Sequence, residues 1–246
     1  MRALALAALA AALLLPSAAL AATPDAFAKS LDRPLATKVV KAKGDVSEIT
    51  CTWYADSMIR ESGTDSPDPD NATLVPIAKG AARPACSATP PAGAITLKTE
   101  GYGLEGRRAG FLIWDASDPN GGASFLVLDA KSGKQLFEDA ISPTLGLRRS
   151  ATLQNGVLRL QYTRGYNANC SLVKDAKGCW ASLVASGAVP RTIPALTAAP
   201  ASCVAAYRKT PKDDPSVITY TVDMTLDAAG QATLKSTGAV SCQPMP

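Results

Sequence analysis

Apolar and polar residues alternate along several short stretches of this chain, as they do in strands that bury one face and expose the other. The alternation is clearest in residues 157–162 and 217–226. Two short apolar runs, residues 111–114 and 125–128, also have the length of buried strands. The pattern therefore predicts a protein built mainly from β-strands.

Turn signals separate these stretches. Asn155-Gly156 stands between two predicted strands, and both residues tolerate the positive φ of a two-residue hairpin turn. Residues 118–122, 129–133 and 227–230 combine Asp with Gly and predict further turns. Consecutive strands joined by short turns pair antiparallel, so the turns favour antiparallel sheets.

Only residues 25–31 predict a helix, with Thr23 as a possible cap and Pro24 in the first turn. Residues 128–136 resemble one strand–turn–strand repeat of quinoprotein-type β-propellers, but no second copy follows, so they indicate a single hairpin. We therefore predict an all-β, mainly antiparallel fold with little helix. Its architecture should be a disulfide-stapled β-sandwich-like or β-meander arrangement.

Proline clusters near residues 84–91 and 190–200 suggest how the chain is organised. They separate an N-terminal β-rich segment, residues 22–94, from a main β-rich domain, residues 95–246. The latter would comprise a central sheet, 95–190, and a C-terminal meander, 191–246. No Gly/Ser-rich linker accompanies the prolines, so all of these parts could also form one compact unit.

The first 21 residues have the features of a secretory signal peptide. A positive start is followed by an apolar run that is too short to cross a bilayer, and Ala19-Leu20-Ala21 is a small-residue cleavage site. We expect a bacterial protein exported to the periplasm or secreted, with no transmembrane segment once residues 1–21 are removed.

The chain has six cysteines and no histidine. In an oxidising compartment an even number of cysteines predicts disulfides, and six cysteines allow 15 pairings. Two cysteines fall in each proline-bounded stretch, which favours neighbour pairing. The predicted disulfides are Cys51–Cys86, Cys170–Cys179 and Cys203–Cys242.

The segment from Arg164 to Asn169 is the strongest candidate for binding. It joins a predicted strand to the Cys170–Cys179 loop, and its Arg164, Tyr166, Asn167 and Asn169 are the residue types found in binding hot spots. Its alternative role is that of a polar loop whose Asn side chains satisfy their own turn. We expect Arg164 and Tyr166 to be replaceable by Ala without unfolding the protein.

Two arginine doublets extend the candidate site. If they converge with Arg164, they could bind an anionic envelope component or an acidic exported protein, because guanidinium groups match phosphate and carboxylate. Scattered arginines that block edge pairing are the alternative. The formal net charge of +4 is too weak to indicate a nucleic-acid partner. The doublets are Arg107-Arg108 and Arg148-Arg149.

The sequence assigns no catalytic residue, cofactor or metal. Ser171-Leu-Val-Lys174 matches the S-x-x-K motif of penicillin-recognising enzymes, but its companion motifs are missing, so a disulfide-closed hairpin loop is expected. The Asp-rich residues 65–71 and the cluster of Asp115, Asp118 and Asn120 fit solvated turns better than a calcium loop.

A carboxylate-dependent hydrolase acting on an envelope or extracellular polymer remains the alternative function. Asp115 with Asp118, or Glu138 with Asp139, would supply the carboxylates. Neighbouring residues on a strand point to opposite faces, which makes Glu138 and Asp139 a poor pair.

Overall fold

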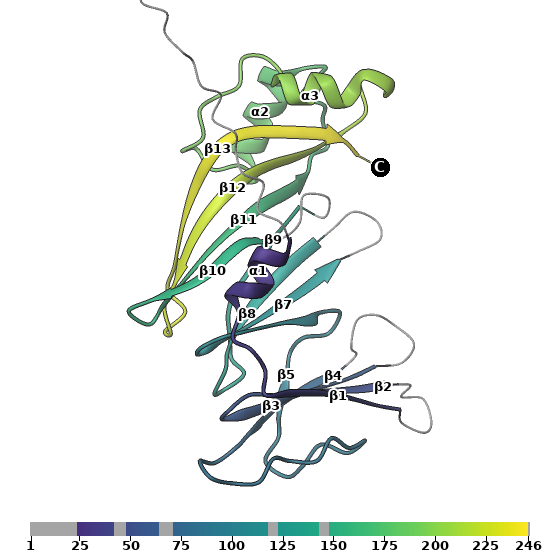
Figure 1. The fold of residues 1–246 in the computed structure, drawn as a ribbon. Helices are drawn as coiled ribbons and strands as arrows, with labels where there is room; N and C mark the ends of the chain where they lie inside the picture. The colour runs from purple at the N-terminus through teal and green to yellow at the C-terminus, as the bar shows by residue number, and fades with distance from the viewer. Residues whose placement is uncertain (1–23, 42–47, 64–70, 118–122, 143–147, 246) are drawn as a thin grey trace, which may run out of the picture.

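Three antiparallel β-sheets stack along the long axis of the molecule in the computed structural model, which describes residues 24–41, 48–63, 71–117, 123–142 and 148–245 (Figure 1). Each sheet is a meander in which consecutive strands are hydrogen-bonded neighbours. The predicted all-β, mainly antiparallel fold with little helix is confirmed, with three layers of meanders.

Sheet A forms one end of the stack and contains the first five strands. These are β1 (Ala36–Lys41), β2 (Glu48–Trp53), β3 (Ser57–Gly63), β4 (Asn71–Pro76) and β5 (Ile95–Leu97).

Sheet B is the middle layer and contains the next four strands. These are β6 (Gly103–Arg108), β7 (Phe111–Ser117), β8 (Ala123–Asp129) and β9 (Gln135–Ala140).

Sheet C is the last layer, and its strands β11 to β13 are the longest of the molecule. Its members are β10 (Arg148–Gln154), β11 (Val157–Asn167), β12 (Ser216–Leu226) and β13 (Ala232–Pro244). Helix α1 (Pro24–Ser30) packs against β10. The connection between β11 and β12 holds α2 (Ala176–Ala185), α3 (Ala201–Ala206) and the 3-10 turn η1 (Tyr207–Lys209).

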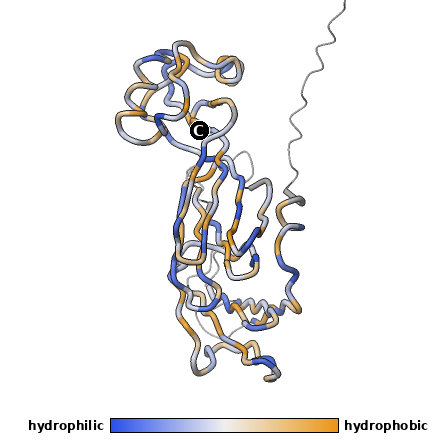
Figure 2. Tube along the Cα trace, turned by 90° about the vertical axis from the view of Figure 1, so that its left-hand side faces the viewer, coloured by the Kyte–Doolittle hydropathy of each residue, from blue (hydrophilic) through white to orange (hydrophobic). Residues whose placement is uncertain are grey.

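A separate core lies on each side of sheet B, because the apolar runs of β7 and β8 direct successive side chains to opposite faces. Hydrophobic and hydrophilic residues are interspersed along the chain (Figure 2). One face of sheet B, with Trp114 and Leu126, packs against Leu74 of sheet A. The opposite face, with Phe125, packs against Tyr162 of sheet C at a ring-centroid distance of 4.8 Å. Sheet B is therefore buried on both faces.

The outer face of sheet A has its own small core. Cys51 and Met58 lie there, and the irregular chain between β4 and β5 covers them through Ile77 and Cys86. Buried Arg60 holds this covering segment, since its Nε donates to the carbonyl oxygen of Ser87 at 2.9 Å.

The predicted turns are present where the structure describes them. Asn155 and Gly156 have φ of 52° and 76°, and they join β10 to β11. Asp129 accepts the N–H of Ser132 in the turn before β9, and Asp227 accepts that of Ala229 in the turn before β13. The turn predicted at 118–122 lies outside the described residues.

The prediction of a single helix is wrong. Residues 24–30 do form α1, although Thr23, its expected cap, lies outside the described residues. Helix α2 occurs where a hairpin loop closed by Cys170–Cys179 was expected, and α3 lies within the stretch expected to be a C-terminal meander. The carboxylate of Asp175 caps α2 by accepting the Gly178 N–H at 2.9 Å, and Cys179 and Cys203 both lie on helices.

All three predicted disulfides are present, and each closes within the layer to which it belongs. Cys51–Cys86 fastens the covering segment to sheet A, Cys170–Cys179 ties α2 to the end of β11, and Cys203–Cys242 joins α3 to β13. Three disulfides fit an oxidising compartment. Within the described residues, no helix has the length and apolar character needed to cross a bilayer.

Candidate ligand-binding site

The inner face of sheet C is longer than either of the two units that cover it. An 11-residue strand such as β11 spans about 37 Å, whereas the seven-residue strands of sheet B span about 24 Å. Sheet B therefore covers one end of this face, and α2 with the chain that follows it covers the other.

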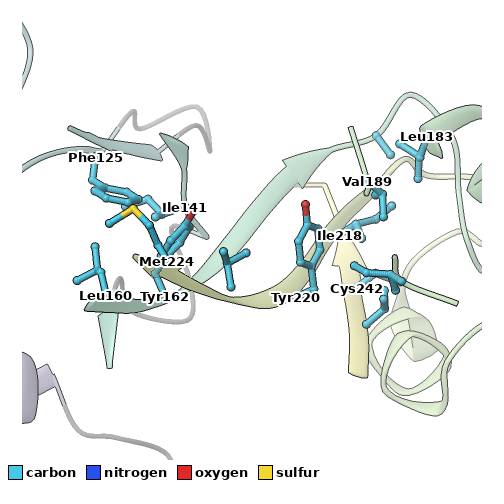
Figure 3. Packing of buried hydrophobic residues seen from close by; sticks show 14 of the residues in the cluster. Phe125, Ile141, Leu160, Tyr162, Leu183, Val189, Ile218, Tyr220, Met224 and Cys242 are labelled. Atoms are coloured by element: carbon cyan, nitrogen blue, oxygen red, sulfur yellow. The ribbon is translucent and has the colours of Figure 1, made fainter. Parts of the chain in front are cut away.

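The two covers can be followed in Figure 3. Phe125 and Ile141 lie with Tyr162 at one end, Leu183 and Val189 lie at the other, and Tyr220 stands between the two groups. A pocket opens where the covers meet, and we call it the seam pocket.

The seam pocket has a volume of about 570 Å³ and takes residues from three parts of the fold. Sheet B supplies one wall, β11 supplies the floor, and the chain directly after α2 supplies the other wall. The lining residues are Ser124, Glu138, Asp139 and Ala140, then Arg164 and Tyr166, then Ser186, Gly187 and Ala188.

Asp139 and Arg164 join the first wall to the floor. The Asp139 side chain is only 5% exposed, and its Oδ1 lies 2.8 Å from Nη2 of Arg164. The hydroxyl of Tyr162 donates to the other carboxylate oxygen. Burial and the neighbouring Asp139 carboxylate raise the pKa of Tyr162, so that its hydroxyl stays protonated and can donate.

Tyr220 connects Arg164 to the second wall. Nη1 of Arg164 donates to the Tyr220 hydroxyl at 3.2 Å, and this hydroxyl donates to the carbonyl oxygen of Ala188 at 3.4 Å. Burial by itself would lower the pKa of Arg164, but the Asp139 carboxylate together with Tyr220 and Tyr162 outweighs it, and the net change is upward. The guanidinium is therefore charged and held between the two walls.

Gly165 allows the first wall to approach β11. A Cβ at this position would lie 2.8 Å from Cα of Ser142 and 2.9 Å from the carbonyl oxygen of Ile141. The N–H of Ser142 donates to the carbonyl oxygen of Thr163, which continues the contact between the end of β9 and β11. A larger residue than glycine would push this wall outward.

Glu138 lies at the rim of the first wall and is exposed. Its Oε1 accepts the Tyr102 hydroxyl and its Oε2 accepts Nε2 of Gln135, each at 2.9 Å. The Tyr102 hydroxyl also lies 2.8 Å from Oγ of Ser124. Both of the donors to Glu138 are neutral, so its negative charge is not balanced by a cation among the described residues.

The predicted binding segment is strand rather than loop. Residues 157–167 form β11, and Arg164 and Tyr166 lie on the face that carries the pocket, because residues two apart on a strand share a face. Asn167 and Asn169 are exposed but do not line the pocket. Tyr166 is 37% exposed and is not part of the core.

The first arginine doublet does not converge with Arg164, as the binding hypothesis required. Arg107 and Arg108 lie on β6, the edge of sheet B opposite β9, about 14 Å or three strand spacings away. Nη2 of Arg107 donates to Asp56 at 2.9 Å, and Arg108 pairs with Asp32 at 3.1 Å. These ion pairs tie sheet B to sheet A and to the chain after α1.

The second doublet lies on β10, beside β11. Arg148 stands opposite Tyr162 in the strand register, and the Arg148 and Arg149 side chains lie outside what the structure describes.

The carboxylates considered for hydrolysis have different surroundings. Glu138 and Asp139 stand opposite Leu126 and Phe125, which belong to different cores, so their side chains lie on opposite faces of β9. The Asp139 oxygens are taken up by Tyr162, Arg164 and the N–H of Ala140. Asp115 lies on β7, and its expected partner Asp118 lies outside the described residues, as do Asn120 and the acidic residues 65–70.

Ser171 has a structural role in the fold. Its hydroxyl is buried and donates to the carbonyl oxygen of Lys212 at 2.5 Å, while it accepts the N–H of Lys174 at 3.3 Å. These bonds close the turn that precedes α2.

Two other hollows contain none of the predicted binding residues. One, of about 480 Å³, lies beneath the chain that joins α1 to β1, and the other, of about 280 Å³, lies on sheet C around Gln161 and Asp223. Of these three pockets, the seam pocket is thus the one that contains predicted binding residues, namely Arg164 and Tyr166.

Sequence reasoning missed the walls of the seam pocket, namely Ser124 and Ala140 on one side and Ser186 to Ala188 on the other. It also missed Tyr102, which orients Glu138. The only available signal was the sequence after Asp175, whose alanines and leucine would have indicated α2 and hence a structured second wall.

Comparison with known proteins adds no family to this picture. No protein-family model matches the chain, and no curated protein matches it. Among solved structures, a mutant of the Synechocystis apocarotenoid oxygenase is similar over 84% of this chain, at 10% identity and a TM-score of 0.24. The chain spans 39% of that protein's length. A likeness at this level carries no argument about fold or function.

Proposed function

We propose that this chain is an exported, disulfide-stabilised binding protein whose ligand occupies the seam pocket. The observation that carries the proposal is the meeting of charged, aromatic and hydroxyl side chains from two sheets in one open pocket of a size suited to a small ligand. The disulfides and the β-rich fold support export of a stabilised protein. Residues 22–94 and 95–246 would act as one compact unit.

The pocket is rigid in ways that favour binding. Arg164 is held from both sides by Asp139 and Tyr220, and the wall at Ser186 follows a helix that the Cys170–Cys179 disulfide fastens to β11. Groups that are already fixed lose little conformational freedom when a ligand arrives, so that their contacts contribute more fully to affinity. Tyr166 is the exposed aromatic anchor in the floor.

Binding is proposed in preference to hydrolysis. The Asp139 carboxylate is occupied in positioning Arg164, so it is not free to serve as a nucleophile or base. Glu138 alone does not make the pair that glycoside hydrolysis requires.

The test uses the disulfide-bonded protein, residues 22–246, labelled with ¹⁵N. A panel of oligosaccharides, di- and tripeptides and polyamines is added one at a time, and the backbone amide signals of Arg164, Tyr166 and Gly187 are followed. At least one probe should shift these signals together, and Tyr166→Ala should weaken that probe by roughly 1–2 kcal/mol.

The matched control is Tyr54→Ala, which removes a tyrosine that lines the hollow beneath α1 and not the seam pocket. Provided that this variant folds, it should bind with wild-type affinity. If no probe shifts the three amides, or if Tyr166→Ala binds as tightly as wild type, the seam pocket is not the binding site.

A further inference from the structure

We propose that two copies of this chain associate through β13, an edge strand of sheet C, by pairing their β13 strands antiparallel about a two-fold axis. The pairing joins two four-stranded sheets C into one continuous sheet. The described lining of the seam pocket contains no residue of β13, so the inference does not depend on the proposed function.

Edge strands are the places where a sheet can pair with another chain, because one side of their backbone carries free N–H and C=O groups. Each of the three sheets has two edge strands. They are β1 and β5 in sheet A, β6 and β9 in sheet B, and β10 and β13 in sheet C.

Every edge strand except β13 is protected. Strand β1 carries two lysines among its six residues, and β5 has only three residues. The carbonyl oxygen of Arg107 on β6 accepts the N–H of Asp32. On β9 a side-chain oxygen of Asp139 accepts the next N–H along the chain, and on β10 the Ser30 hydroxyl accepts the N–H of Ala151.

Strand β13 lacks such protection over residues 232–237, within the part of the chain that the structure describes. Residues 232–235 are all exposed, and Lys235 is the one charged residue of the stretch. Helix α3 packs on the other end of the strand, where Cys203 is bonded to Cys242. Figure 1 shows β13 as the outermost strand of sheet C. The open edge is therefore about 20 Å long.

The register of the β12–β13 hairpin shows which backbone groups point outward. The N–H of Asp227 donates to the carbonyl oxygen of Gln231, so these residues form a hydrogen-bonded pair. Such pairs alternate along an antiparallel ladder, so every second residue from Gln231 onward is bonded to β12. The N–H and C=O groups of Ala232, Leu234 and Ser236 therefore point away from β12, toward the open side.

Leu234 lies at the centre of the proposed pairing. It stands opposite Met224, which is buried in the core shared by sheets B and C, yet Leu234 is 45% exposed. A two-fold axis at Leu234 sets this side chain about 5 Å from its copy and covers both. No like charges stand opposite one another in this register, whose other pairs are Ala232 with Ser236 and Thr233 with Lys235. The strand is thus complementary to itself, as a two-fold interface requires.

The test uses the disulfide-bonded protein, residues 22–246, in sedimentation velocity at concentrations from about 1 to 300 μM. Because the paired stretch is short, we expect a reversible dimer with a micromolar dissociation constant. Leu234→Lys sets two like charges opposite each other on the axis and should weaken the dimer at least tenfold. The replaced side chain is exposed, so the fold should be retained.

The matched control is Val39→Lys. Val39 is an exposed apolar residue on the edge strand β1, 51% exposed, and receives the same charge. The dissociation constant of the dimer should not change in this variant.

Hydrogen exchange followed by NMR tests the register in the wild-type protein. The amides of Ala232, Leu234 and Ser236 should become protected as the protein concentration rises, because only the partner strand can bond them. The amides of Thr233 and Lys235 are already bonded to β12 and should be protected at every concentration.

A protein that stays monomeric at the highest concentration would overturn the proposal. A dimer in which the amides of residues 232, 234 and 236 remain unprotected would also overturn it, because such a dimer forms through another surface. The same holds for a dimer that Leu234→Lys leaves unchanged. None of these results bears on the seam pocket, whose ligands are followed at the amides of Arg164, Tyr166 and Gly187.

Discussion

The ion pair of Asp139 and Arg164 joins the first wall of the seam pocket to its floor. Removing either residue would lower the stability of the fold, because the other charge would lose its partner. The carboxylate is almost fully buried and depends on the guanidinium and on Tyr162 for its hydrogen bonds. Removing one partner of such a pair leaves an uncompensated charge away from water. Arg164 therefore has a structural role in addition to any contact with ligand, and it differs in this from Tyr166.

Arg164→Ala should lower the free energy of unfolding by about 2 kcal/mol, less than for a fully buried pair because the Arg164 side chain is 30% exposed. Urea unfolding followed by tryptophan fluorescence measures the change. In an Asp139→Asn background the same substitution should cost much less. Equal losses in both backgrounds would mean that Arg164 and Asp139 are not coupled.

At the scale of single elements, alternation predicted the strands well and failed for the helices. Leu158, Leu160 and Tyr162 are buried on one side of β11 as their spacing requires. In α2 the buried residues are Cys179, Trp180 and Leu183, whose spacing suits a helix. The close spacing of Cys170 and Cys179 indicated a short disulfide-closed loop, and a helix was therefore not predicted there.

The walls of the pocket could not be predicted because they depend on contacts between distant segments. Asp139 reaches Arg164 only because β9 ends beside β11, and Ala188 reaches Tyr220 only because α2 packs on sheet C. Nothing in the local sequence of either wall indicates these partners. The arginine doublet at 107–108 was visible in the sequence, but its ion pairs across to Asp56 and Asp32 were not.

The contact between sheet A and sheet B should depend on pH through Asp56. The side-chain hydrogen bond from Arg107 holds the pKa of Asp56 below its ordinary value of 3.8. A carboxyl group with a lowered pKa in the folded state stabilises the fold above its unfolded pKa, and this contribution is lost as the pH falls. The stability advantage of wild type over Asp56→Asn should therefore be constant near neutral pH and shrink below about pH 4.

Thermal unfolding of both proteins between pH 2.5 and 7 measures this difference. Asp214→Asn serves as the comparison, because that side chain is only partly buried and lies far along the chain near β12. A gap between wild type and Asp56→Asn that stays the same down to pH 2.5 would contradict the assigned role of Arg107.

For the whole molecule, each layer is built from consecutive strands, and no disulfide crosses from one layer into another. Sheet A carries one disulfide, and sheet C with its helices carries two. This arrangement follows the division of cysteines by prolines that is visible in the sequence. The stacking of the three layers was not visible there, because it depends on sheet B having two apolar faces.

The exported protein should begin at Ala22 and contain no free thiol. Intact-mass measurement after treatment with iodoacetamide under denaturing conditions should show no added label without reductant, and six labels after reduction. Peptide mapping should link Cys170 with Cys179 in one fragment. Label incorporated before reduction, or a chain that still starts at Met1, would contradict export into an oxidising compartment.

Helix α1 comes first in the chain but packs on the last sheet to be made. Phe27 belongs to the core shared with sheet C, and the Ser30 hydroxyl accepts the N–H of Ala151, which is 121 residues further along. In the N-to-C export that we propose, the docking surface of this helix would not exist until β10 and its neighbours had crossed the membrane. The chain that follows the expected cleavage site would therefore stay uncovered until β10 arrives, which would leave that site open to a signal peptidase. Docking of α1 therefore has to wait for β10, although the helix itself is made first.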